Sequence, residues 1–243
     1  MKIVLLGATG GIGSELVKHL VKDNEVVAVA RNEQKLKDLS DECRSPNLRI
    51  LEMDVSSKEA VRRGFAKFKK IDVLINCVGV LGPVCMFGES TLSDWERALS
   101  INLMGLVYVT YFSLPILQKS RRGKIINFSG GGSAYPRPYH TAYGTAKTGM
   151  IRFLETVAVE YPNLDINSIA PGAYKTNMWK EETHDKEPDN WGDMERLKKF
   201  VEFLCSERSD GITGKFIHYK DNWEKFDKMV LDKDMFTLRR VEK

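Results

Sequence analysis

Two residues with complementary acid–base chemistry, Tyr143 and Lys147, lie four positions apart in a segment, 142–161, whose apolar residues recur at helical spacing. On a helix, this spacing puts both side chains on one face, one turn apart. A free phenol has a pKa of about 10, and a nearby cation favours the phenolate, which brings the group toward the working range of a catalytic acid. The pair therefore predicts a proton donor. Chance alone is expected to produce about one such pair, so the prediction needs other motifs beside it.

A glycine-rich turn follows the first apolar run and opens a helical pattern. It reads Gly7-Ala8-Thr9-Gly10-Gly11-Ile12-Gly13. Glycine allows positive φ angles and has no Cβ where the backbone must approach a pyrophosphate, and the free N–H groups at the helix start face the negative charge. The run satisfies two glycine templates, one through Gly10 and one through Gly11, and a tight turn without a ligand is the alternative. We expect Thr9 and Ile12 to belong to the same cofactor site.

The end of the second predicted strand indicates which dinucleotide binds. NAD-selective sites place a carboxylate there for the ribose 2′-hydroxyl, whereas a 2′-phosphate needs a cation. This chain has Arg31 at that point, with Lys35 one helical turn further on. The sequence favours NADP(H) over NAD(H), and the alternative is that Arg31 is a solvated surface charge.

Apolar runs of strand length alternate with segments of helical period along the chain. Strands are predicted at 2–6, 25–29, 48–53, 73–75, 124–128, 165–169 and 215–218, the first six buried on both faces, and helices at 13–22, 34–42, 58–68, 92–117 and 142–161. Parallel neighbours need a crossover, which is usually a helix. The order therefore predicts an α/β fold with a doubly wound parallel sheet of the Rossmann type, and 243 residues suit one domain over 1–243.

Composition excludes several other classes of protein. Apolar residues make up 42% of the chain, which predicts a packed core, and the net charge of +4 is too small and too evenly spread for a nucleic-acid binder. No apolar run reaches the roughly 18 residues of a membrane span. The four cysteines lack metal-ligand spacing, so we expect reduced thiols in a cytoplasmic protein and no metal site. His140 is expected to cap a helix or lie on the surface, and His184 has no rigid ligand spacing.

The motifs, in their order, resemble the compact single-domain branch of the short-chain dehydrogenase/reductase family, from residue 2 to about residue 217. The further matching pieces are Asp54-Val55, Asn76-Cys77-Val78-Gly79, Asn102, Tyr143-Gly144-Thr145-Ala146-Lys147, and Pro171-Gly172 followed by Thr176. The resemblance implies an oxidoreductase that interconverts a ketone and a secondary alcohol with NAD(P), a small-molecule carbonyl substrate, and a homodimer or homotetramer.

The resemblance also implies a role for each matching residue. Tyr143 would protonate the alkoxide as hydride reaches the carbonyl carbon, Lys147 would bind the nicotinamide ribose, and Asn102 would hold a water in a proton relay. The other contacts would be to the cofactor: Asp54 and Val55 at the adenine, Asn76 and Gly79 below the adenosine ribose, and Pro171, Gly172 and Thr176 at the nicotinamide end.

One position departs from the family pattern. The family places a serine, whose hydroxyl polarises the substrate carbonyl, thirteen residues before the tyrosine, where this chain has Gly130 within the run 128–133. In an unbent strand Ser129 would face the wrong side, but three consecutive glycines free the backbone. We expect Ser129 or Ser133, preferably Ser129, or N–H groups of the glycine run to take the role. A catalytically weakened NADP(H)-binding sensor or scaffold is the alternative function.

Two later segments lie outside the motifs. Residues 176–192 are polar and charged and are predicted to form a lid over the substrate, with Trp179 and Tyr174 as contacts. The C-terminal extension, 221–243, is predicted to present an apolar packing face to this chain's active-site mouth or to a neighbouring subunit. That face consists of Trp223, Phe226, Met229 and Val230, with Phe236 beyond it.

Overall fold

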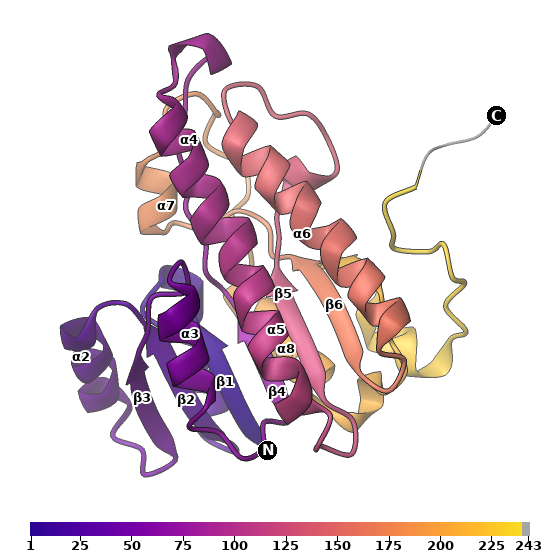
Figure 1. Cartoon of the computed structure of the whole chain (residues 1–243). Coiled ribbons are helices and arrows are strands. Elements are labelled where there is room, and N and C mark those ends of the chain that lie inside the picture. The colour runs from indigo at the N-terminus through magenta and orange to yellow at the C-terminus, as the bar shows by residue number, and fades with distance from the viewer. Residues whose placement is uncertain (240–243) are drawn as a thin grey trace.

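A parallel sheet forms the centre of the computed structural model, which describes residues 1–239 (Figure 1). Its strands are β1 (Lys2–Leu6), β2 (Glu25–Ala30), β3 (Leu48–Glu52), β4 (Val73–Asn76), β5 (Lys124–Phe128), β6 (Asp165–Ala170) and β7 (Lys215–His218). They lie in the order β3-β2-β1-β4-β5-β6-β7, and all neighbouring pairs are parallel. The strand order reverses between β1 and β4, as in a doubly wound sheet. The predicted fold class is confirmed.

Helices cover both faces of this sheet (Figure 1). They are α1 (Gly11–Leu20), α2 (Glu33–Cys43), α3 (Lys58–Phe65), α4 (Leu92–Leu99), α5 (Gly105–Leu117), α6 (Thr141–Glu160), α7 (Asn177–Lys180) and α8 (Met194–Cys205). Side chains of α1, α2 and α8 share one buried apolar cluster, and those of α3, α5 and α6 share another. The two clusters are the two cores of a three-layer domain.

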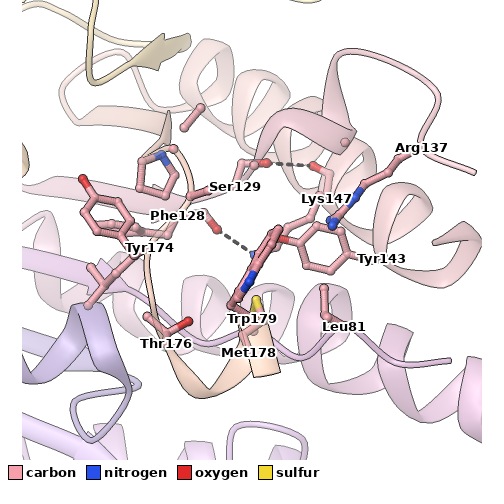
Figure 2. Close-up of a pocket in the computed structure, with 18 of the residues that line it drawn as sticks. Leu81, Phe128, Ser129, Arg137, Tyr143, Lys147, Tyr174, Thr176, Met178 and Trp179 are labelled. Atoms are coloured by element: carbon pink, nitrogen blue, oxygen red, sulfur yellow. Dashed lines mark hydrogen bonds between the residues drawn. The ribbon is translucent and has the colours of Figure 1, made fainter. Parts of the chain in front are cut away.

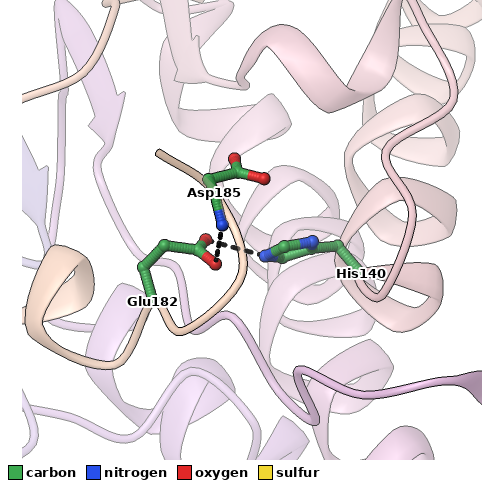
Figure 3. Close-up of side chains that lie close together, drawn as sticks. All are labelled: His140, Glu182 and Asp185. Atoms are coloured by element: carbon green, nitrogen blue, oxygen red, sulfur yellow. Dashed lines mark hydrogen bonds and ion pairs between the residues drawn. The ribbon is translucent and has the colours of Figure 1, made fainter. Parts of the chain in front are cut away.

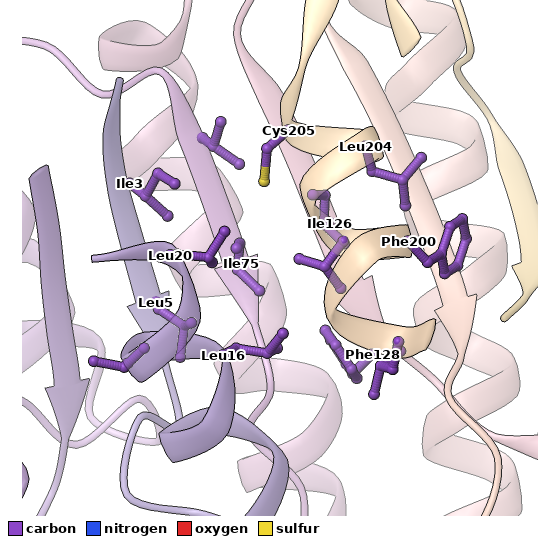
Figure 4. Close-up of a cluster of buried hydrophobic side chains, with 14 of the residues drawn as sticks. Ile3, Leu5, Leu16, Leu20, Ile75, Ile126, Phe128, Phe200, Leu204 and Cys205 are labelled. Atoms are coloured by element: carbon purple, nitrogen blue, oxygen red, sulfur yellow. The ribbon is translucent and has the colours of Figure 1, made fainter. Parts of the chain in front are cut away.

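Strand β1 shows how the sequence produces both cores. Side chains alternate across a strand, so Ile3 and Leu5 enter the core beneath α1 and α8 (Figure 4), while Val4 and Leu6 enter the opposite core. All four are fully buried, and each contributes about 1.5 to 3 kcal/mol relative to an exposed position. Strand β3 differs from the prediction that it is buried on both faces. It lies at the sheet edge, and Arg49 and Glu52 are exposed.

The predicted helix at 92–117 is interrupted by a π turn, Ser100–Met104, between α4 and α5. By length and composition the whole stretch, Leu92–Leu117, could also span a membrane. It packs instead within the fold, because α5 contacts α3 and the π turn contacts α6. Helix α8 is absent from the sequence prediction, although Leu197, Val201 and Leu204 recur at helical spacing and are buried.

The C-terminal extension packs on its own chain. A 3₁₀ helix, Trp223–Lys228, carries the first part of the predicted apolar face, and the Trp223 ring stacks on Phe200 of α8 with centroids 5.3 Å apart. The following segment runs along β7, where the Phe216 N–H donates to the Phe236 carbonyl at 2.6 Å. Val230 stays exposed because the helix has already ended. Residues 240–243 of the predicted extension lie outside the described range.

Candidate active site

Two adjoining cavities, of about 550 and 430 Å³, lie at the carboxyl ends of the central strands. Residues after β1, β4 and β6 form the boundary between them, because Ile12, Gly79 and Thr176 line both cavities. Ligands of open α/β sheets bind at this edge, where the strand order reverses. We call the larger space the substrate cavity and the smaller one the adenosine cavity.

The glycine-rich turn forms one wall of the adenosine cavity. Gly7 has a φ of +76°, which favours glycine, and a Cβ added to Gly13 would lie 2.2 Å from the Gly7 carbonyl oxygen. A Cβ on Gly11 would lie 2.5 Å from Cγ2 of Thr176. Helix α1 begins here without an acidic residue in its first turn, so its N–H groups face the cavity free of a competing carboxylate. Thr9, Gly10 and Ile12 line the same wall, so the turn fits a pyrophosphate.

Cationic side chains gather at the far end of the adenosine cavity. Arg31 and Lys35 line it, and neither has a carboxylate within 4.0 Å in residues 1–239. Asn32 caps α2 by accepting the Lys35 N–H at 2.9 Å, which fixes the turn between the two cations. Asp54 and Val55 also lie in this wall. The end of the cavity is therefore able to hold a phosphate as well as a ribose.

The two asparagines predicted to touch the cofactor or its water, Asn76 and Asn102, also hold the backbone of the loop after β4. Asn76 is buried outside both cavity walls, donates to the Asn127 side chain at 2.9 Å and accepts the Val78 N–H at 3.3 Å. It thereby holds the turn that carries Gly79, and its place below the adenosine ribose stays a prediction. Asn102 bonds the backbone N–H and carbonyl of Val80 at 3.0 and 2.9 Å. The π turn brings its Oδ1 to one side of Gly79, beside Lys147.

Tyr143 and Lys147 face the substrate cavity from the first turns of α6 (Figure 2). The Lys147 Nζ lies 5.6 Å from the centre of the Tyr143 ring and donates to the Phe128 carbonyl at 2.8 Å. Burial lowers the pKa of Lys147 to about 8. Burial also raises the pKa of Tyr143, and the positive charge of Arg137 opposes that rise. The spacing argument thus places the pair correctly, but it did not identify Arg137 as the cation that acts on the phenol.

The serine hydroxyls that flank the glycine run are hydrogen-bonded to the protein, although Ser129 lines the substrate cavity together with Tyr143. Ser129 Oγ donates to the Lys147 carbonyl at 3.3 Å (Figure 2) and shares a hydrogen bond of 3.0 Å with Ser133 Oγ, which bonds the Gly130 carbonyl. The backbone N–H of Ser129 remains in sheet register with Ile169, so the glycines do not turn it. Both hydroxyls thus already have partners within the protein, and a carbonyl-polarising role for Ser129 or Ser133 stays a prediction.

The wall after β6 completes the nicotinamide side of the substrate cavity. Pro171 and Gly172 line it; Gly172 has a φ of +82°, which favours glycine, and a Cβ there would lie 2.8 Å from the Tyr219 ring. Thr176 then begins α7 and the predicted lid. Trp179 packs edge-to-face on Trp191 at 5.1 Å, and Tyr174 also lines the cavity, as predicted.

A buried carboxylate ties the lid to the loop before α6 (Figure 3). Glu182, whose side chain is 1% exposed, accepts from His140 Nε2 at 2.7 Å and from Arg137 through one oxygen. Its other oxygen accepts three backbone N–H groups, of residues 183–185. Burial would raise the pKa of Glu182, but the N–H groups of 184 and 185 and the His140 contact outweigh it and lower the pKa to about 2. His140 does stand at the N-cap position of α6, as one of the two expectations had it, but its side chain is fully buried and makes no capping hydrogen bond, so a surface position is wrong.

His140, Glu182 and Asp185 bring three potential metal ligands within 4.8 Å of one another. The Arg137 guanidinium, however, bonds both carboxylates, so an arginine takes the position that a metal ion would need. No spacing in the sequence pointed to this cluster, because Arg137 and Glu182 belong to two irregular loops 45 residues apart.

The sheet, the glycine turn and the Tyr143 and Lys147 pair define the class of protein. The family model described as short chain dehydrogenase matches residues 1–187. The chain is 33% identical over 187 residues to 11-beta-hydroxysteroid dehydrogenase-like 3 of Arabidopsis thaliana, which covers 73% of this chain and 60% of that protein. It is 30% identical over 233 residues to the 3-oxoacyl-(acyl-carrier-protein) reductase FabG of Aquifex aeolicus, which covers 88% and 94%.

The chain therefore belongs to the short-chain dehydrogenase/reductase family, a family of oxidoreductases. It spans about 60% of the length of the Arabidopsis relative. A short-chain dehydrogenase from Shigella flexneri, crystallised with NADP, has the same fold, with a TM-score of 0.82 at 24% identity over 90% of this chain and 96% of that one.

Proposed function

We propose that this protein is an NADP(H)-dependent oxidoreductase that interconverts a ketone and a secondary alcohol, with Tyr143 as the proton donor. The observation that carries the proposal is that Tyr143 and Lys147 line a cavity that continues into the glycine-walled adenosine cavity. The bound nicotinamide supplies or accepts the hydride. Tyr143 gives its proton to the oxygen as the alkoxide forms, while Lys147, Gly172 and Thr176 hold the two reactants together.

The cofactor preference rests on Arg31 and Lys35. Neither has an ion-pair partner in the described chain, and a 2′-phosphate would supply one. Because a hydrogen bond to a charged group contributes about 1.5 to 3 kcal/mol, Arg31→Asp should weaken NADPH binding at least about tenfold and leave NADH binding nearly unchanged. Arg49→Asp, on the exposed edge strand β3, is the matched control. Equal losses for NADPH and NADH would contradict this preference.

The substrate is proposed to be a neutral carbonyl compound with an apolar body. Leu81, Tyr135, Met178 and Trp179 surround the space in front of Tyr143. Two carboxylates of that wall, Glu182 and Asp185, hold Arg137 between them. A phosphorylated or nucleotide-linked sugar would bring its negative charge close to these carboxylates, which would oppose its binding.

The test is steady oxidation of NADPH with a panel of neutral aromatic and alicyclic ketones, compared with phosphorylated ketoses. Tyr143→Phe should lower kcat by about 10²- to 10⁴-fold, because the phenol is the proton donor. Tyr161→Phe, just past the other end of α6, should keep the wild-type rate. Turnover that survives Tyr143→Phe would refute the proposed role of the phenol.

A sensor or scaffold that binds NADP(H) without turnover is the second candidate function, and Gly130 is the observation that favours it. A Cβ there would lie 3.0 Å from the Tyr143 Oη, so the family's serine hydroxyl is missing from the reacting side of the ring. Tight NADPH binding without turnover of any ketone in the panel would favour the sensor.

A further inference from the structure

The side of Tyr143 that faces the glycine run lacks a serine hydroxyl. Position 130 is a glycine, and the hydroxyls of Ser129 and Ser133 are bonded to each other and to backbone carbonyls. A ketone reductase nevertheless needs a donor at the carbonyl oxygen, because negative charge develops there while hydride reaches the carbon. The question, which rests on the proposed function, is which group supplies that donor.

Arg137 lies along this side of the ring (Figure 2). Its guanidinium carbon is 5.7 Å from the centre of the Tyr143 ring. A Cβ on Gly132 would lie 3.5 Å from Cδ of Arg137 and 3.8 Å from Cδ1 of Tyr143. A Cβ on Gly130 would lie 3.7 Å from Cε1 of Tyr143. Arg137 and the two glycines therefore lie close to the same Tyr143 ring.

Carboxylates of the lid hold the guanidinium in place. Nε donates to Asp185 at 2.8 Å, and Nη2 bonds Glu182 and Asp185. Nη1 has no hydrogen-bond partner in residues 1–239, so two donors of this rigid fork are left over. Arg137 lines the substrate cavity, and its charge opposes the burial that raises the pKa of Tyr143.

We propose that Arg137 takes the place of the missing serine hydroxyl and donates from Nη1 to the substrate carbonyl oxygen. In reduction, hydride adds to the carbonyl carbon, the C=O π electrons move to oxygen, and Tyr143 transfers its proton to that oxygen. Arg137 keeps its protons and stabilises the charge during the transfer. Because Glu182 and Asp185 belong to the lid, the donor is in position only when the lid is docked, so closure of the lid completes the site.

The test is a double-mutant cycle between Arg137→Met and Gly130→Ser. Removing one such donor typically costs about 10²-fold or more in kcat, so we expect that loss for Arg137→Met in the wild-type background. In the Gly130→Ser background a hydroxyl stands beside the Tyr143 Oη, and the same substitution should cost less than about tenfold. Lys186→Met, which removes a positive charge from an exposed part of the lid, is the matched control and should leave kcat unchanged.

If Arg137→Met lowers kcat by the same factor in both backgrounds, the inference is overturned. That result would mean that Arg137 only links the lid to the fold, because a hydroxyl at position 130 cannot replace such a link. If Gly130→Ser fails to bind NADPH, the pH profile decides. Without Arg137 the pKa of the phenol rises, so the high-pH limb of ketone reduction should move to higher pH, and an unmoved limb with near-wild-type kcat overturns the inference.

The two proposals fail in different ways. Full activity of Arg137→Met together with an inactive Tyr143→Phe removes only the role of Arg137. Activity that survives Tyr143→Phe, or a wild-type enzyme without any ketone turnover, removes the proposed function and this inference with it.

Discussion

Glu182→Gln should release the lid while it preserves the shape of the side chain. The carboxylate accepts from Arg137, from His140 and from three backbone N–H groups of the lid itself. The glutamine side chain has only one carbonyl oxygen, which can still accept from the backbone N–H groups of the lid turn. Arg137 and His140 then face its NH₂ group or, if the amide is flipped, a neutral oxygen in place of the carboxylate. The docked lid should therefore lose two charge-assisted hydrogen bonds.

The size of the effect follows from these contacts. A hydrogen bond to a charged group contributes about 1.5 to 3 kcal/mol and a neutral one about 0.5 to 1.5 kcal/mol, so each replaced bond loses about 1 kcal/mol or slightly more. Two such losses amount to about 2 to 3 kcal/mol. The equilibrium between the docked and undocked lid should then shift by a factor of about 30 to 150.

Hydrogen exchange measured by mass spectrometry on a peptide covering 181–190 reports this equilibrium. The amides of 183–185 are bonded to Glu182, so their exchange at pH 7 should accelerate by about that factor in the variant. Because the pKa of Glu182 is lowered to about 2, the carboxylate stabilises docking above about pH 4.5 and loses this effect as the pH falls toward 2. The wild-type lid should thus remain docked at pH 5.

Glu187→Gln is the control in the same lid. Glu187 is exposed and pairs with Lys175 at 3.6 Å, and such surface pairs contribute at most about 1 kcal/mol. Hydrogen exchange of the same lid peptide in Glu187→Gln should match that of the wild type. If Glu182→Gln also exchanges within about threefold of the wild type, the buried carboxylate does not hold the lid.

Two further predictions concern the pH dependence and the stability of the fold. The pKa of Lys147 is lowered to about 8 by burial, so between pH 8 and 10.5 the unfolded chain binds more protons than the folded one. In urea titrations, the difference in unfolding free energy between the wild type and Lys147→Met should therefore change in favour of the wild type by up to about 3 kcal/mol from pH 8 to pH 10.5. A difference that does not change with pH would contradict the lowered pKa of Lys147. Trp223→Ala should lower the unfolding free energy by about 3 to 5 kcal/mol, because the buried ring packs on Phe200 and Phe203 and its Nε1 donates to the Tyr219 carbonyl. Val230→Ala, at a position 97% exposed, should change it little, and similar values for the two variants would show that the extension adds no stability.

The sequence predicted those parts of the site that depend on local geometry. Gly7 and Gly13 stand in a strand-to-helix turn whose backbone leaves no room for a Cβ, and a four-residue spacing suffices to put Tyr143 and Lys147 on one helix face. The alternation of strands and helices led to the sheet for a similar reason, since each crossover is a local unit.

The parts that the sequence did not predict depend on contacts between distant loops. Arg137 and Glu182 meet across 45 residues without any periodic pattern, and the π turn at Asn102 forms where that side chain bonds the backbone of Val80. The position of Ser129 was uncertain because glycine permits many backbone conformations. Sheet pairing with Ile169 selects one of them.

The segment that runs along β7 also limits how copies of this chain could associate. Strand β7 is the last in the sheet, and its N–H groups that point away from β6 belong to Phe216 and His218. The first donates to the Phe236 carbonyl and the second to the Asp221 carboxylate at 2.8 Å. A second copy would therefore find no free donors along this strand with which to extend the sheet across two molecules. Copies of this chain that extended the sheet would have to pair through its other edge strand, β3.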